Sequence, residues 1–374
     1  MKFGFTEEQE MIREMAARFA EREIRQQAGS LDESERFDRP VYDRMAELGF
    51  TGLPWPESEG GSGAGFLSLT IVLEELSIVN ASMAAALWSH VCLAAWPIYR
   101  FGQRELKLRY WRKLAEGQLL GAGMLPQMLG ERSSLRVGVI AWADGDGYVL
   151  EGLQKYVFGG TEADVFVVYA LMGEEKGANR RKRYHVFLVE KGSAGLEIIP
   201  AARKLGLRSS GMAHLKFEQC RLVRAQRIGR EGQGGAIARM AEVRVRYGLA
   251  AIAAGIVNGA SASALVYAQE RNQFGKPIAR HQAIAFALAD MHMAAEASKL
   301  LAYQAAWRED EGLADEDRAV RALHYAADAA VKSAIQAIQI FGGYGYTKDY
   351  PVERYLRDAK AVQLAGGLGS VRRR

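Results

Sequence analysis

The chain has 374 residues and a formal net charge of +5, with 49% hydrophobic and 25% charged residues. This composition is typical of a soluble globular protein, and the length predicts two or three packed units. The sequence contains no basic helix with interleaved aromatic residues and no run of about 18 apolar residues. We therefore expect neither a nucleic-acid partner nor a membrane span.

The cysteines and histidines indicate a reducing compartment and no metal centre. Cys92 and Cys220 are the only cysteines, too few for a disulfide framework or a metal quartet, which favours the cytoplasm. The six histidines include no HxxxH or HExxH pair. The N-terminal sequence also lacks the apolar core of a signal peptide. Cys220, in FEQCRL, is expected to be a packed strand residue rather than a nucleophile.

Residues 1–118 have the pattern of an N-terminal all-α domain. Thr6 followed by Gln9 is a capping-box signature at the start of an amphipathic helix. A second helix is expected with Asp38 as its N-cap and Gly49 past its end.

Residues 119–230 predict a middle β domain. Short runs rich in β-branched and aromatic residues are separated by Gly, Asp and Lys clusters: YVL, DVFVVYAL, YHVFLVE, LEIIP and HLKFEQC. No helix-length insert separates these runs, so an antiparallel sheet or small barrel is expected rather than βαβ units. The basic stretch NRRKR (179–183) is expected to be a solvated turn between two strands.

Residues 231–374 predict a C-terminal helix bundle. Ala-rich helical patterns cover residues 236–311, and a last helical pair flanks the break FGGYGYTKDYP. Long, apolar, Ala-rich helices are typical of a bundle whose helices pack closely. The chain is therefore expected to be mainly α, with its β domain in the middle.

Glycine clusters occur at 60–65 (GGSGAG), 229–235 (GREGQGG) and 342–346 (GGYGY). The first follows a helix rather than a strand, which argues against a dinucleotide-binding loop. The second is expected to be a hinge or turn between sheet and helix. The third is either a helix–helix turn with one glycine at positive φ, or bare backbone that approaches the phosphates of a ligand.

The segment ERNQFGKPIARHQAI (270–284) also has two interpretations. In one, Arg271 and Lys276 only solvate a helix end and Phe274 belongs to the core. In the other, Arg271 binds a pyrophosphate while Phe274 packs on an adenine ring. The residues alone leave both open.

Four stretches together resemble the acyl-CoA dehydrogenase family, in collinear order over essentially the whole chain: FTEEQEMIREMAARFAEREI, KLGLRSSGMAHLKFEQCRL, RNQFGKPIARHQAIAFALADM and IQIFGGYGYTKDYPVERYLRDAK. The resemblance implies an N-terminal α domain, a middle β barrel and a C-terminal four-helix bundle. It also implies a homodimer or homotetramer, with FAD held between the β domain, the bundle and a neighbouring subunit.

Carried over by position, the resemblance implies the residues that bind cofactor and substrate. Arg246, in VRVRYG, matches the arginine that helps to hold the acyl-CoA portion of the substrate. The expected FAD contacts, largely across a subunit interface, are Arg271, Gln273, Phe274, His281, Gln282, Gln339, Gly342 and Gly343.

The sequence departs from the family at both positions where family members carry the catalytic carboxylate. The usual glutamate position, shortly after the R-D-A-R-like motif, is Gly366. The alternative seat, just before Arg246, is Val245, and the acidic residue two places earlier is Val243. Glu242 is the nearest substitute, but an exposed Glu beside arginines is more typical of a surface ion pair than of a base.

The residues expected around the flavin ring also differ from the family pattern. The L-T-E-P-x-x-G-S-D loop aligns with residues 125–133, where Pro126, Gln127 and Arg132 replace Thr, Glu and Ser. The threonine of the W/F-I-T strand is Phe158. The surroundings of the isoalloxazine are rewritten, while the contacts on the adenosine side persist.

Three functions are consistent with this pattern. The first is an FAD-dependent oxidoreductase acting on an acyl thioester of CoA or of a carrier protein, with altered or relocated chemistry. Electrons would then pass to an electron-transferring flavoprotein or to oxygen. The second is a flavin monooxygenase-like member, which needs no carboxylate base. The third is a non-catalytic paralogue that binds an acyl ligand or a partner subunit.

Overall fold

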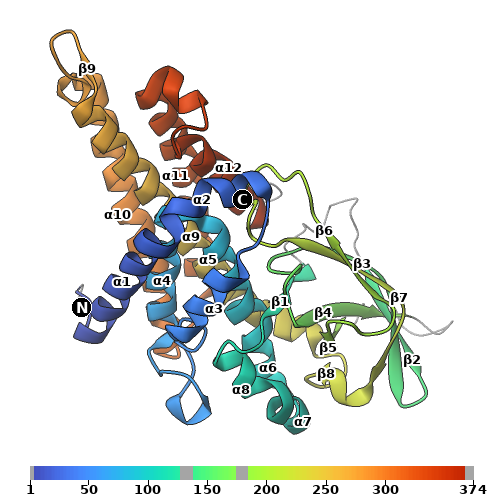
Figure 1. The fold of residues 1–374 in the computed structure, drawn as a ribbon. Coiled ribbons are helices and arrows are strands. Elements are labelled where there is room, and N and C mark those ends of the chain that lie inside the picture. Colours follow the sequence, from blue (N-terminus) through green and yellow to red (C-terminus); the bar gives the residue numbers. More distant parts are fainter. Residues whose placement is uncertain (1–3, 127–137, 174–183, 367–374) are drawn as a thin grey trace.

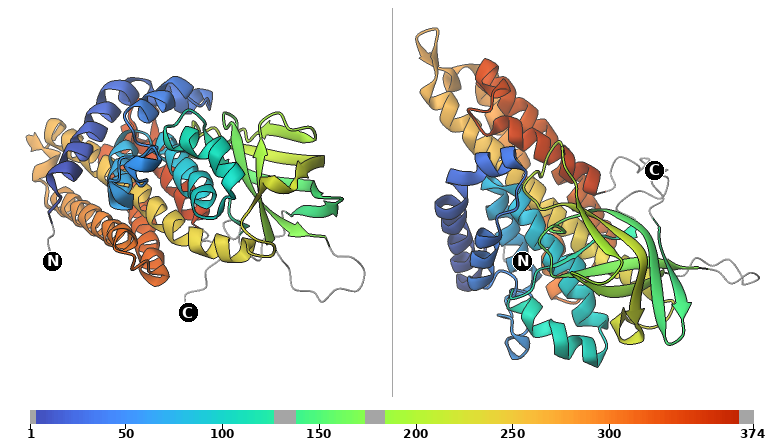
Figure 2. Two further views of the ribbon diagram at one scale, coloured as in Figure 1. Left: turned by 90° about the horizontal axis from the view of Figure 1, so that it is seen from below. Right: turned by 45° about the vertical axis from the view of Figure 1, so that its right-hand side comes forward.

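The computed structural model describes residues 4–126, 138–173 and 184–366. Helices from the two ends of the chain pack side by side, and a β domain lies against one end of them (Figures 1 and 2). The order of helices, strands and helices is the one expected from the sequence. The stretch NRRKR, Gln127 and Arg132 lie outside the described residues.

The N-terminal helices begin at the caps that the sequence predicts. The Thr6 hydroxyl accepts from the Gln9 N–H at 3.2 Å, and the Gln9 side chain accepts from the Thr6 N–H at 3.1 Å. Asp38 accepts from the Val41 N–H at 3.1 Å. The elements are α1 (Glu7–Phe19), η1 (Ala20–Ile24), η2 (Arg25–Gln27), α2 (Ala28–Ser34), α3 (Arg39–Glu47), η3 (Glu57–Glu59), α4 (Gly65–Val79), α5 (Ala81–Trp88), η4 (Ser89–Ala95), α6 (Trp96–Phe101), α7 (Arg104–Leu106), η5 (Lys107–Trp111) and α8 (Arg112–Ala115).

The middle domain is an eight-stranded, mostly antiparallel sheet in the order β6-β7-β3-β2-β4-β5-β8, with β1 paired to β4. Strand β4, which contains the run VFVVYAL, lies between β2 and β5 in the sheet and packs against η4. Its first six residues are buried, which explains why the run does not alternate with charged residues. The strands are β1 (Gly121–Gly123), β2 (Val139–Asp144), β3 (Gly147–Val157), β4 (Val165–Met172), β5 (Tyr184–Glu190), β6 (Leu196–Pro200), β7 (Ala213–Val223) and β8 (Arg227–Ile228); a 3-10 turn, η7 (Arg224–Gln226), precedes β8.

Four long helices form the C-terminal bundle: α9 (Gly234–Glu270), α10 (Gln282–Asp310), α11 (Glu316–Phe341) and α12 (Val352–Ala365). Alanines on their facing sides allow close packing, and α9 also lies against α4. A Cβ at Gly255 would stand 2.3 Å from the carbonyl oxygen of Glu74, so only glycine permits this approach. The N-terminal and C-terminal helices therefore share one core.

Among the described residues, two helical stretches, 81–101 and 234–270, are long and apolar enough to cross a membrane by length and composition alone. Neither stretch is an unbroken run of about 18 apolar residues, but their scattered polar residues still leave a high mean hydropathy. The most apolar windows of the two stretches are 100% and 67% buried inside the protein. They are the central helices of its core.

A short hairpin, β9 (Asn272–Gln273) with β10 (Lys276–Pro277), joins α9 to α10 through the 3-10 turn η8 (Ile278–Arg280). It projects beyond the helices at the end of the molecule opposite the β domain (Figure 1). The loop between α11 and α12 forms the 3-10 turn η9 (Gly342–Tyr346). These two connections carry most of the residues expected to contact a cofactor.

Candidate functional site

A pocket of 520 Å³ lies where the end of α9 meets η9. Its walls include Arg271 and Gln273 from one connection, and Gly342 and Gly343 from the other. Tyr267 and Phe341 stack at 4.1 Å between ring centroids and hold the two helices in place. None of the described residues that line the pocket is acidic. The structure thus brings four of the expected cofactor contacts together beside an exposed guanidinium.

The three glycines of GGYGY differ in whether backbone conformation or packing requires a residue without a side chain. Gly342 has φ 60° and ψ −133°, a conformation that side chains strongly disfavour, so the positive φ expected of this turn is found there. A Cβ at Gly345 would lie 2.5 Å from the Ile338 carbonyl oxygen. Gly343 is exposed, its φ is not positive, and no atom lies within 4 Å of the Cβ position. Neither packing nor backbone geometry explains that glycine.

The other expected cofactor contacts lie outside this pocket. Gln339 lines a neighbouring pocket of 460 Å³ together with Lys348 and Arg357. His281 precedes α10, and its Nε2 lies 3.2 Å from the Gln273 carbonyl oxygen. Gln282 is the first residue of α10 and is exposed.

Phe274 lies at the tip of the hairpin and is 92% exposed. Its φ is 52° and that of Gly275 is 75°, the combination that a tight two-residue hairpin turn requires. Its ring meets the ring of His281 at 6.0 Å between centroids. The interpretation that placed Phe274 in the core of the subunit is wrong, because the hairpin carries the ring away from the helices.

Gly366 is the C-cap of α12, with φ −70° and ψ −1°, and its N–H donates to the Val362 carbonyl at 3.0 Å. A Cβ there would stand 2.8 Å from Cδ2 of Leu323, a buried residue of α11. At the alternative seat, Val245 is buried, as is Val243. Neither position supplies a carboxylate.

Glu242 is mostly buried, with 12% of its side chain exposed, and not the exposed residue that the sequence suggested. It pairs with Arg246 at 2.7 Å, while Arg246 also reaches Glu316 at 2.7 Å. Burial raises the pKa of Glu242, and the charge of Arg246 opposes that shift. Arg246, the expected substrate contact, is therefore neutralised by two carboxylates within the chain. Arg244 is not part of this pair, because it contacts Glu309 instead.

Of the rewritten flavin-ring positions that the structure describes, Phe158 is packed in the core and Pro126 is half-buried. Phe158 is 2% exposed and meets Trp88 edge-on at 5.4 Å between centroids. The Phe158 carbonyl accepts from the hydroxyl of Ser89 at 3.0 Å. Pro126 follows the buried Leu125 at the last described position before the gap.

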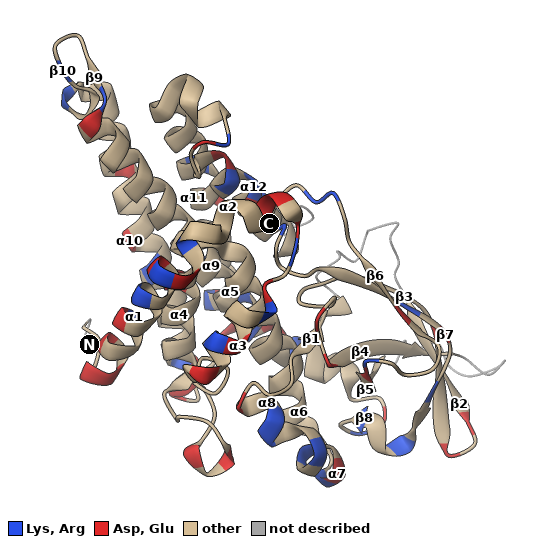
Figure 3. Ribbon diagram, in the orientation of Figure 1, with Lys and Arg blue, Asp and Glu red and all other residues tan. Residues whose placement is uncertain are grey.

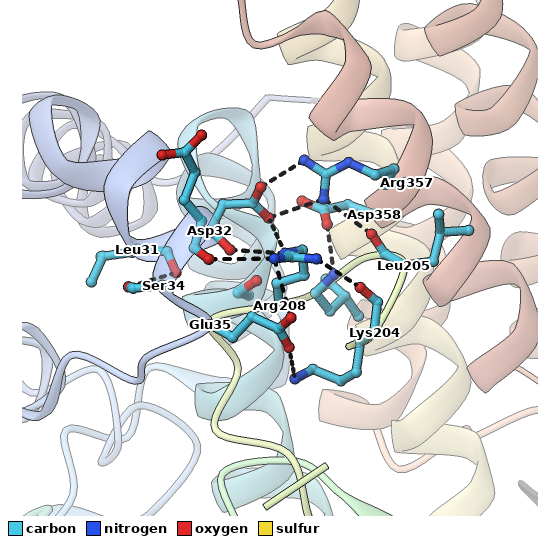
Figure 4. Close-up of polar contacts among 12 residues, drawn as sticks. Leu31, Asp32, Ser34, Glu35, Lys204, Leu205, Arg208, Arg357 and Asp358 are labelled. Atoms are coloured by element: carbon cyan, nitrogen blue, oxygen red, sulfur yellow. Dashed lines mark hydrogen bonds and ion pairs between the residues drawn. The ribbon is translucent and has the colours of Figure 1, made fainter. Parts of the chain in front are cut away.

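A polar junction that sequence reasoning missed fixes α12 against both other domains (Figure 4). Arg357 binds both carboxylate oxygens of Asp32 in α2, at 3.1 and 2.6 Å. The neighbouring Asp358 accepts from the Leu207 N–H at 2.6 Å, and burial raises its pKa to about 6. A Cβ at Gly206 would lie 2.0 Å from the Arg357 carbonyl oxygen, which explains the glycine in KLGLR.

The same junction continues into the loop before β7. Arg208 donates to the Asp32 carbonyl at 2.8 Å and pairs with Glu35 at 3.1 Å. Lys204 reaches Glu35 at 3.2 Å. Two of the stretches that carry the family resemblance, KLGLR and YLRDAK, therefore meet here, and their contacts set the direction in which α12 runs toward Gly366.

The fold places a β domain between two helical parts of the chain, and this order of domains defines a class of proteins. Comparison with sequence profiles identifies the family. The profiles described as the N-terminal, middle and C-terminal domains of acyl-CoA dehydrogenase match residues 6–118, 131–220 and 232–374. The chain belongs to the acyl-CoA dehydrogenase family.

Individual relatives agree over nearly the full length. The short-chain-specific acyl-CoA dehydrogenase of Clostridium acetobutylicum is 38% identical over 373 residues, which covers 100% of this chain and 98% of the relative. The structure of butyryl-CoA dehydrogenase from Megasphaera elsdenii superposes with a TM-score of 0.92 at 34% identity, covering 98% and 96% of the two chains. The prolyl acyl carrier protein oxidase AnaB gives 0.89 at 29% identity, covering 97% and 96%.

Proposed function

We propose that this chain is an FAD-dependent oxidoreductase that acts on an acyl thioester by chemistry that does not use a carboxylate at position 366. The observation that carries the proposal is the pocket in which Arg271 and Gln273 face Gly342 and Gly343. A guanidinium next to bare backbone in a non-acidic pocket suits the diphosphate of a dinucleotide.

The residues present fit FAD. Gly343 has open space where a Cβ would lie, and Gly342 provides a turn that only glycine adopts readily. The nearly fully exposed ring of Phe274 is suited to cover an adenine held by another subunit. His281, Gln282 and Gln339 lie around the same end of the bundle and would complete the contacts. We propose a homodimer or homotetramer on this basis.

The substrate proposed is an acyl thioester of CoA or of an acyl carrier protein. The family and the short-chain relative support the CoA ester, and the likeness to a prolyl acyl carrier protein oxidase supports the carrier-bound ester. The neutralised state of Arg246 favours a carrier thioester, because an arginine already paired with Glu242 and Glu316 is less available to the anionic groups of CoA. The electron acceptor proposed is an electron-transferring flavoprotein or oxygen.

The altered chemistry follows from the missing base. When bound, FAD supplies a hydride acceptor, and removal of the substrate α proton requires a base within hydrogen-bond reach. Loss of such a base costs about 10²–10⁴ in rate. Glu242 is the candidate that could substitute, because its burial favours the protonated form that a base must reach after accepting a proton. Its ion pair with Arg246 must then open.

A flavin monooxygenase-like reaction is the second candidate. It is favoured by the absence of a carboxylate at both Gly366 and Val245, and by Phe158 in place of the threonine beside the ring. In a non-catalytic paralogue, the third alternative, the same substitutions would accompany the loss of flavin.

The test is the absorption spectrum of the purified protein with a panel of acyl-CoAs and acyl carrier protein thioesters under anaerobic conditions. A flavin spectrum that bleaches with a thioester supports the oxidoreductase. No bleaching, with oxygen uptake when a flavin reductase is added, supports the monooxygenase-like reaction. A colourless protein that also fails to take up added FAD would overturn both. Arg271→Gln should weaken FAD binding, with Arg280→Gln, an exposed residue outside the pocket, as matched control.

A further inference from the structure

A further pocket, of 670 Å³, lies at the junction of α6, β8 and the start of α9, and shares no lining residue with the two pockets described above. It is lined by Arg100, Phe101, Gln103, Arg227, Gly229, Arg230 and Gln233. Three of these seven residues are arginines, and none of the described lining residues is acidic. The Gly229 N–H donates to the Phe101 carbonyl at 2.9 Å, which joins the two walls.

Arg227 is an unusual residue for a protein interior. It is 7% exposed, and its Nε has no hydrogen-bond partner. One guanidinium nitrogen donates to the hydroxyl of Tyr148 at 2.6 Å. The carboxylate of Glu231 reaches it only at 4.0 Å, from a side chain that is 70% exposed. A buried guanidinium with one neutral hydrogen-bond partner and only a distant, exposed carboxylate is costly unless a closer anion completes its contacts.

The helix behind the pocket adds a second source of positive potential. α9 is 37 residues long, its first turn contains no acidic residue, and its N-cap Gln233 makes no side-chain capping bond. Gln233 instead accepts from the Arg230 N–H at 2.9 Å and lines the pocket. The N-terminus of a long helix attracts anions through its free N–H groups and its dipole.

The surface around the pocket is basic as well. Residues 100–113 contain six Lys and Arg against one Glu, and residues 221–230 contain four Arg and no acid. These segments pack together, α6 against β8 and α7 against η7, and their cations gather at that end of the molecule (Figure 3). Such a field raises the local concentration of anions.

We propose that this pocket binds a phosphate-bearing small molecule through Arg100, Arg227 and Arg230. The guanidinium fork matches phosphate oxygens, and three forks around one concavity suit a compact, multiply charged anion. The acidic surface of a protein is the less suitable occupant, because Arg227 is buried and a broad surface contacts the exposed arginines only. The site is independent of the cofactor pocket and of the function proposed above.

The test measures binding of inorganic pyrophosphate to the purified full-length chain, by calorimetry and by thermal shift at constant ionic strength. We expect saturable binding that the double variant R100Q/R230Q weakens about tenfold or more, since each lost contact is a charge-assisted hydrogen bond. R104Q/R112Q changes the net charge equally at exposed arginines outside the pocket, and should weaken binding much less, through the surrounding field alone. Arg227→Lys should also weaken binding, but the surface variants keep the test valid if it does not fold.

A second ligand separates the sources of the phosphate. If adenosine 3′,5′-bisphosphate binds more tightly than pyrophosphate, and R100Q/R230Q removes the difference, the pocket holds a nucleotide phosphate. If the two ligands bind with equal affinity, the pocket binds free phosphates and does not recognise the nucleoside. The proposal is overturned if pyrophosphate gives no saturable binding, or if both double variants weaken it equally. It is also overturned if only polyglutamate binds in a manner that depends on Arg100 and Arg230, which would make the region a protein-docking surface.

Discussion

Arg357 in α12 binds both carboxylate oxygens of Asp32 in α2, although 325 residues separate them in the sequence. Asp32 is 7% exposed, so this bidentate pair is largely removed from water. The pair ties the first helices of the chain to the helix that ends at Gly366. It therefore links the stability of the fold to the position of Gly366, where the resemblance predicts the base of the family.

The first prediction concerns this ion pair. Asp32→Asn keeps the size of the side chain but leaves Arg357 paired with Glu353 alone among its carboxylate partners, and should lower the free energy of unfolding by about 1–3 kcal/mol. Urea denaturation measures the change. As a matched control, Glu116→Gln breaks the exposed pair with Arg112 and should cost less than about 1 kcal/mol. If both variants lose the same free energy of unfolding, the buried Asp32–Arg357 pair stabilises the fold no more than an exposed ion pair does.

The second prediction concerns the bare position at the end of α12. Gly366→Glu should raise any thioester dehydrogenase activity, whereas Gly366→Gln, which has the same shape without the acid, should not. The new Cβ would lie 2.8 Å from Cδ2 of Leu323, so the substitution should also cost about 1–3 kcal/mol of stability.

The companion change Leu323→Val removes the δ carbons and should recover part of that loss. Activity is followed by anaerobic flavin bleaching with acyl-CoA, and stability by thermal unfolding. If the Glu and Gln variants have the same activity, more than the base is missing from the site.

Local signals in the sequence predicted the elements, because caps and hydrophobic periods act over a few residues. The Thr6–Gln9 capping box and the Asp38 cap are formed, and the apolar run of β4 is buried. The family motifs also located Arg271 and Gly342, which the structure brings into one pocket. That assignment depended on resemblance, since the residues alone left the turn and the ligand contact equally open.

The sequence could not reveal the features that depend on contacts between distant segments. No period or motif relates Asp32 to Arg357, and none marks Arg227 as a buried arginine with an unpaired Nε. Glu242 was taken as exposed because its neighbours are arginines, yet α9 is buried over most of its length in the shared core. Burial of a charged residue is a property of the assembled fold rather than of its local sequence.

The third prediction separates the two adjacent glycines of the cofactor pocket. Gly342→Ala should destabilise the protein by about 1 kcal/mol or more, because φ 60° with ψ −133° is strained for any residue with a Cβ. Gly343→Ala has no such strain and open space around its Cβ, so the fold should be unaffected. If a dinucleotide approaches this backbone, Gly343→Ala should nevertheless weaken FAD binding, measured by flavin titration. Unchanged affinity in this variant would place the cofactor elsewhere.

The fourth prediction concerns Glu74, a buried carboxyl of α4 that accepts a hydrogen bond from the Tyr303 hydroxyl. Burial raises the pKa of Glu74 from its ordinary value of 4.5 to about 7, and the Tyr303 hydrogen bond opposes that shift. Among the charged groups around it, Glu75 and Glu296 raise this pKa further and Lys299 lowers it.

Because the folded state holds the Glu74 proton more tightly, this group stabilises the fold fully below about pH 4.5 and loses that contribution as the pH rises through 7. Between pH 5 and pH 8 the wild type should therefore lose about 2–3 kcal/mol relative to Glu74→Gln, which cannot ionise. Urea denaturation of both proteins across this range isolates the effect, since all other titrating groups are common to them. Tyr303→Phe removes the hydrogen-bond donor that favours the Glu74 carboxylate, so the pKa of Glu74 should rise further. The loss of stability should then extend to higher pH, and the variant should be less stable than the wild type at pH 8. A pH-independent difference between wild type and Glu74→Gln would show that the Glu74 carboxyl keeps one charge state throughout this range.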